Sequence, residues 1–155
     1  MDGRKSALLA LAGASLMAAG GAVAAGRGDN GIVGVWIVNH TSAPFPYHMY
    51  VFNADGTMQQ ANPDAGNERR SDSDAKGVWA IRRGHVVGKW VEISADRATH
   101  RYAGRGELSY DIVVKRDRLT GSGSFRGYDT AGKLTVGPLA APFTGARVTL
   151  PKQLP

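Results

Sequence analysis

The sequence predicts an all-β protein whose single domain is an antiparallel up-and-down β-barrel of about eight to ten strands. Three observations lead to this prediction. After residue 26 helical periodicity is almost absent, the β-rich runs are short, and most of them are joined by turns that contain glycine. The expected strands are 32–40, 47–52, 57–62, 77–82, 85–94, 100–103, 107–115, 119–128, 133–136 and 143–150.

Residues 1–25 precede this domain and have the pattern of a cleavable signal peptide. Arg4 and Lys5 form a basic start, an apolar run covers 7–19, and small residues end in Ala22-Val23-Ala24-Ala25. The apolar run is shorter than the roughly 20 residues that a membrane span needs. We therefore expect residues 26–155 to be periplasmic or secreted, with no stable membrane insertion after signal cleavage.

The turns favour a meander. Residues 53–56, the pair Arg83-Gly84 and residues 129–132 each supply a short, glycine-containing link between two expected strands. Short links join neighbouring antiparallel strands, whereas a two-sheet sandwich would need longer crossover connections. The one long polar link, 62–75, is expected to form a loop at the rim of an opening.

Glycines inside strand-like stretches support the barrel. Gly104 and Gly106 interrupt one stretch, and Gly121, Gly123 and Gly127 another. Such glycines mark bulges, bends or close backbone approach, which a strongly coiled small barrel needs.

Gly34-Val35-Trp36 lies near the start of the first expected strand. A Gly-x-Trp at this place resembles the lipocalin and calycin superfamily, in particular short bacterial lipocalin-like proteins. The resemblance implies that Trp36 closes one end of the barrel and that a basic residue late in the chain, here Arg147, packs on its ring. Gly-x-Trp also occurs at Gly77-Val78-Trp79 and Gly88-Lys89-Trp90.

Composition argues against several functional classes. Lys and Arg number 19 against 13 Asp and Glu, for a net charge of +6, but the basic residues are scattered in pairs and form no continuous face for nucleic acid. There is no cysteine, so neither a disulfide nor a lipoprotein attachment site is expected. His48, His85 and His100 lack metal-ligand spacing, and no phosphate loop or nucleotide fingerprint is present, so neither a metal nor another cofactor is expected. No pattern specifies an oligomeric state.

Alternation along the strands predicts the inward-facing residues. They are aromatic and aliphatic with a few polar groups, which is typical of a site for a small apolar or aromatic ligand. The residues expected to bind the ligand are Tyr50, Phe52, Met58, Gln60, Asn62, Trp90 and Phe125. A fully packed interior explains the same pattern equally well.

Glu92 is the most informative single residue. If it shares the inward face with Trp90, burial raises its pKa and suits it to proton transfer. If Val91 and Ile93 face the core instead, Glu92 is an ordinary solvated charge.

Three functional hypotheses follow. The first is an exported barrel that binds a hydrophobic or aromatic small molecule. The second is a cofactor-free isomerase, cyclase or lyase in the same barrel, with Glu92 as acid or base and Tyr110 or His48 as its hydrogen-bond partner. The third is a structural or inhibitory envelope protein that uses its basic exterior against an acidic partner.

Overall fold

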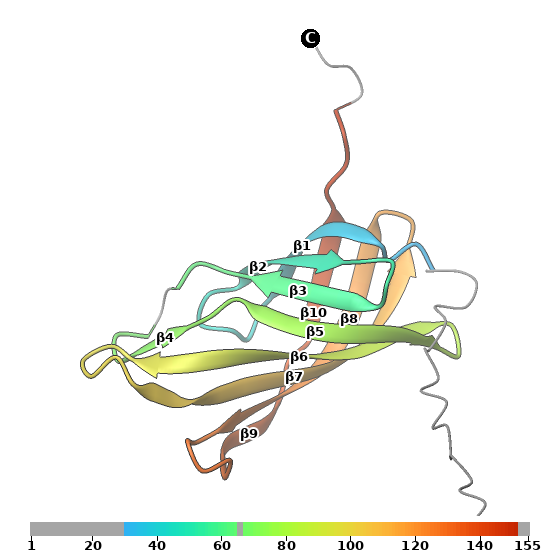
Figure 1. The fold of residues 1–155 in the computed structure, drawn as a ribbon. Coiled ribbons are helices and arrows are strands. Elements are labelled where there is room, and N and C mark those ends of the chain that lie inside the picture. The colour runs from blue at the N-terminus through green and yellow to red at the C-terminus, as the bar shows by residue number, and fades with distance from the viewer. Residues whose placement is uncertain (1–29, 65–66, 152–155) are drawn as a thin grey trace, which may run out of the picture.

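The computed structural model describes residues 30–64 and 67–151, and every regular element in these ranges is a β-strand (Figure 1). The ten strands are β1 (Gly34–His40), β2 (Tyr47–Phe52), β3 (Thr57–Ala61), β4 (Arg70–Asp72), β5 (Ala75–Arg82), β6 (His85–Asp96), β7 (Tyr102–Lys115), β8 (Arg118–Tyr128), β9 (Leu134–Ala140) and β10 (Phe143–Arg147). The predicted all-β class is confirmed. The predicted signal peptide, residues 1–25, lies outside the described residues.

Eight of these strands form a closed antiparallel barrel (Figure 1). The strands β1, β2, β3, β5, β6, β7 and β8 pair in that order, and β10 then pairs with both β8 and β1. The register of β10 places Arg147 opposite Trp36 in β1 and Gly145 opposite Leu119 in β8. Because the ladder returns to its first strand, the eight-stranded ring has no free edge, and the barrel is confirmed over the sandwich.

Two strands lie outside this ring and extend one end of it. β4 pairs with the far end of β6, and β9 pairs with the half of β8 that β10 does not cover. β6 and β7 are the longest strands, with 12 and 14 residues, and their shared hairpin projects beyond the barrel together with β9 (Figure 1). This end of the barrel is therefore bounded by loops and by the long strands β6, β7 and β8, here called the tall wall.

Several strand boundaries differ from the sequence-based expectation, and three of the differences change the arrangement of the elements. The expected strands 100–103 and 107–115 are one strand, β7, because Gly104 fits inside it with φ at +131° and the partner strand shifts register between Ser94 and Ala95. The polar link 62–75 is not all loop, since it contains β4. β9 is longer than expected and runs to Ala140.

Trp36 closes the other end of the barrel. Its side chain is fully buried, and its Nε1 donates a hydrogen bond to the Ile32 carbonyl at 2.7 Å. The Arg147 guanidinium lies 4.3 Å from the Trp36 ring centre, which confirms the expected stacking. Gly34 is required here because its φ is +132° and a Cβ would lie 2.7 Å from the Arg147 guanidinium.

No helix among the described residues is long and apolar enough to cross a membrane.

Candidate functional site

A cavity of about 580 Å³ lies at the end of the barrel opposite Trp36, where β1 ends at His40. Its walls come from the β1–β2 connection, from the tall wall of β6, β7 and β8, and from the end of β9. Its apolar lining includes Phe45, Trp90, Leu108, Phe125 and Leu139. Its polar lining comprises His40, Ser42, His48, Asn62, Asn67, Asp72 and Glu92.

The alternation of side chains along β6 directs the Glu92 side chain towards this cavity. Trp90 and Ser94, two residues to either side, are buried, whereas Ile93 is 49% exposed on the outer face. Of the two orientations that the sequence permits, Glu92 therefore has the inward one. Glu92 lines the cavity together with the Trp90 and Phe125 rings, whose centres are 6.3 Å apart.

Gly106 makes room for this arrangement. It is the register partner of Glu92 on β7. A Cβ at this position would collide with Oε1 of Glu92 and would lie 2.9 Å from the Phe125 ring. The absence of a side chain at residue 106 is thus what lets a carboxylate and an aromatic ring lie together over β7.

Burial raises the pKa of Glu92 to about 7, and the negative charge of Asp72 adds to this effect. Asp72 lies on β4, where it pairs with Ser94 and accepts a hydrogen bond from the Ser94 hydroxyl at 2.5 Å. Within the described part of the chain, no hydrogen-bond donor or cation contacts the Glu92 carboxylate. Near neutral pH Glu92 therefore exchanges readily between its charged and neutral forms.

Two histidines line the cavity in their neutral form. Burial, with a smaller repulsion from His48, lowers the pKa of His40 to about 4. The His40 Nε2 lies 2.8 Å from the Tyr50 hydroxyl, which also accepts a hydrogen bond from Trp90 at 3.1 Å. Since Trp90 can only donate, the Tyr50 proton is free to bond to His40.

His48 is held by both ring nitrogens. Its Nδ1 accepts a hydrogen bond from the Gln60 side chain at 2.8 Å, and its Nε2 donates to the Phe45 carbonyl at 2.9 Å. Burial lowers the pKa of His48, which the bond to Phe45 opposes in part. Gln60 also donates to Asn62 at 2.6 Å, so the histidine, the amide pair and the β1–β2 connection form one network.

The structure brings together five of the residues singled out from the sequence. Those that line the cavity are His48, Asn62, Trp90, Glu92 and Phe125. Tyr50, Phe52, Met58, Gln60 and Tyr110 also face inward, but they are packed in the core below the cavity. The Tyr110 hydroxyl points to the Val78 carbonyl, 3.4 Å away, and not to Glu92. The interior is thus packed towards Trp36 and hollow at the opposite end.

Other lining residues were missed from the sequence. Among them are His40, Phe45, Asn67, Asp72 and Leu139, together with Gly106 beneath Glu92. Most lie in connections or in the part of β9 beyond its predicted end, where the alternation along expected strands made no prediction. For Gly106 a signal existed, because a glycine inside a strand indicates that another group approaches the backbone closely.

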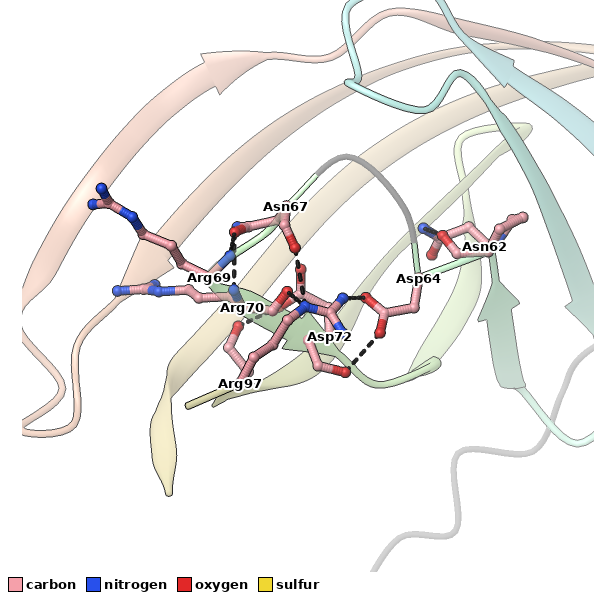
Figure 2. Close-up of polar contacts among 10 residues, drawn as sticks. Asn62, Asp64, Asn67, Arg69, Arg70, Asp72 and Arg97 are labelled. Carbon is pink, nitrogen blue, oxygen red and sulfur yellow. Dashed lines mark hydrogen bonds and ion pairs between the residues drawn. The ribbon is translucent and has the colours of Figure 1, made fainter. Parts of the chain in front are cut away.

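The rim of the cavity includes residues 62–64 and 67–72, here called the rim loop (Figure 2). Arg97, in the β6–β7 hairpin, fastens it to the barrel wall. The Arg97 Nε donates to the carbonyls of Asn67 at 3.0 Å and Arg70 at 2.9 Å, and its Nη2 pairs with Asp64 at 2.6 Å (Figure 2). The rim loop thereby holds Asp72 beside Glu92.

In the described ranges, 30–64 and 67–151, no three His, Asp or Glu side chains gather in a way that could hold a metal ion.

The fold and the cavity define a class of protein: a closed antiparallel barrel with one end closed by a tryptophan and the other end hollow. Comparisons with protein-family models, with curated proteins and with solved structures found no match to this chain.

Proposed function

We propose that this protein binds a small apolar or aromatic molecule in the cavity at the open end of its barrel. The observation that carries the proposal is the cavity itself. Its volume of about 580 Å³ falls within the range of ligand sites in proteins, and aromatic and aliphatic walls surround a small set of polar groups.

Two features support a lipocalin-like or calycin-like barrel as the setting of this function. One is the single antiparallel ring of eight strands, and the other is the Gly34-Val35-Trp36 motif with Arg147 stacked on its indole. The signal-like pattern of residues 1–25 further supports a role in the periplasm or outside the cell.

The test uses N-phenyl-1-naphthylamine, a neutral apolar probe whose fluorescence rises when it leaves water. We expect saturable binding to the wild-type protein. Ala140→Trp, which places a large ring at the cavity mouth, should weaken binding about tenfold, a loss of about 1.4 kcal/mol. Ala54→Trp, in the exposed β2–β3 turn, is the matched control and should leave binding unchanged. Absence of saturable binding, or equal loss in both variants, would refute the proposal.

A second candidate is a cofactor-free isomerase, cyclase or lyase. It is favoured by the position of Glu92 in the cavity and by its pKa of about 7, which suits a general acid or base. Binding remains the first choice because Glu92 has no hydrogen bond to a titratable partner in the described structure. His48 lines the same cavity, but both of its nitrogens are occupied.

A further inference from the structure

We propose that the ligand of this cavity is a small organic cation, a protonated amine on an apolar or aromatic body, with its ammonium group between Glu92 and Asp72. This inference rests on the proposed function, because it specifies the charge of the molecule that the same cavity binds.

The charge of the lining is the first argument. Among the described residues, no Lys or Arg lines the cavity and His40 and His48 are neutral, so the ionisable lining side chains that can carry a charge near neutral pH are the two carboxylates of Asp72 and Glu92. The chain as a whole has 19 Lys and Arg against 13 Asp and Glu. An acidic cavity in a basic protein favours a cation inside it and disfavours an anion.

The arrangement of the two carboxylates is the second argument. Asp72 on β4 is paired with Ser94 on β6, and Glu92 lies two residues from Ser94 on the same face. The two acids are therefore diagonal neighbours across two paired strands, within reach of one small group. Asp72 is partly satisfied by the Ser94 hydroxyl. Glu92 has no donor in the described part of the chain, so an ammonium would supply the missing partner.

Within residues 30–64 and 67–151, no cationic side chain competes for this position. The groups that face Glu92 from neighbouring elements are Asp72 on β4, the Tyr50 hydroxyl on β2, and the neutral His40 and His48. On the outer face of β6 and β7, the basic side chains of Lys89 and Arg105 are bound to Glu107, at 2.5 and 2.8 Å.

The aromatic wall is the third argument. Trp90 and Phe125 flank Glu92. The faces of aromatic rings attract cations, and this attraction is stronger in a partly desolvated site than at an exposed surface. The same rings accept the apolar body of an amine, so the cavity matches both halves of such a molecule.

Three ligands that share an indole ring test the proposal: tryptamine, indole-3-ethanol and indole-3-acetate, titrated by isothermal calorimetry. At pH 8 we expect tryptamine to bind at least about tenfold more tightly than the neutral alcohol, and the anion most weakly. A cation requires ionised Glu92. The affinity for tryptamine should therefore fall about tenfold from pH 8 to pH 6 and that for the alcohol should stay constant.

Substitutions separate the contribution of the Glu92 carboxylate to ligand binding from the contribution of the rest of the cavity. Glu92→Gln should abolish both the preference for tryptamine and its pH dependence while it keeps binding of the alcohol. Asp72→Asn, which retains the contact with Ser94, should reduce the preference in part. Glu107→Gln, on the outer face of the neighbouring strand, is the matched control and should behave as wild type.

The outcomes distinguish this inference from the proposed function. Equal binding of tryptamine and the alcohol overturns the cationic ligand and leaves the binding function in place. Binding of none of the three also overturns it, and the result with N-phenyl-1-naphthylamine then decides the binding function separately. If Glu92→Gln does not fold, the proposal is tested by the pH dependence of tryptamine affinity in the wild-type protein and by the reduced preference for tryptamine in Asp72→Asn.

Discussion

Two arginines stack on aromatic rings at the same distance, but they differ in the other contacts that their guanidinium groups make. Arg147 and Arg105 each lie 4.3 Å from a ring centre, over Trp36 and Tyr128 respectively. Arg147 also donates to the backbone carbonyls of Val33, at 2.7 Å, and Gly31, and it pairs with Asp117 at 3.2 Å. It therefore connects the segment before β1, the β7–β8 turn and the end of β10.

We expect Arg147→Ala to lower the free energy of unfolding by about 2 to 4 kcal/mol. The substitution removes the stacking, leaves the half-buried Val33 carbonyl without its charged donor and removes the contact with the exposed Gly31 carbonyl. Arg105→Ala, which removes a more exposed stacking and one ion pair, should lower it by clearly less. Urea unfolding followed by tryptophan fluorescence measures both. Equal losses would contradict the role assigned to Arg147.

At the scale of elements, a side chain from another hairpin contacts the rim loop at three points. The rim loop contains only one short strand, β4, which has three residues. Arg97 supplies contacts to Asp64, Asn67 and Arg70 from outside the loop (Figure 2). They add to the hydrogen bonds that Asp64 and Asn67 accept within the loop. Because Asp72 belongs to this loop, the acidic side of the cavity is positioned by the β6–β7 hairpin.

Arg97→Ala should release the rim loop, and trypsin then reports the change by cleavage after Arg69 or Arg70. We expect the cleavage rate at these sites to rise about tenfold, since local opening needs fewer contacts to break. Arg101→Ala removes an exposed basic residue from the same hairpin and one trypsin site, and should leave the rate unchanged. A similar rate in all three proteins would show that other contacts hold the loop.

For the whole molecule, two buried groups oppose each other in their effect on stability. Glu92 has its pKa raised from 4.5 to about 7, so folding favours its protonated form, and its contribution is lost as pH rises between these values. His40 has its pKa lowered from 6.5 to about 4, so its contribution is present above pH 6.5 and lost as pH falls. The lowered pKa of His48 acts in the same direction as that of His40. Between about pH 4.5 and 6.5 the slope from Glu92 and the slope from the histidines therefore have opposite signs.

The stability of the wild-type protein should therefore change little between pH 4.5 and 6.5, and single variants should reveal each component. In Glu92→Gln the free energy of unfolding should rise with pH across this range, by up to about 3 kcal/mol. In His40→Gln, which can keep a hydrogen bond to Tyr50, it should instead fall with pH up to about 7. Urea unfolding at half-unit pH steps measures the three profiles, and a flat profile for Glu92→Gln would contradict the titration of His40.

The resemblance at Gly34-Val35-Trp36 implied the packing of Arg147 on Trp36, and the sequence by itself determined the all-β class, the meander and the barrel. These follow from local signals: glycine-containing turns fix which strands are neighbours, and a period of two fixes which side chains face inward. The same period placed Tyr50, Phe52, Trp90 and Phe125 on the inner face.

Only the tertiary structure decided which part of that inner face is hollow. Alternation assigns a side chain to a face of the sheet but not to a depth in the barrel, so Tyr50 and Phe52 in the core and Trp90 at the cavity were indistinguishable in sequence. The cavity walls depend on the pairing of β4 with β6 and of β9 with β8, and on Arg97 reaching the rim loop. Asp72 and Glu92 are 20 residues apart in the chain, and long-range strand pairing alone makes them neighbours in one cavity.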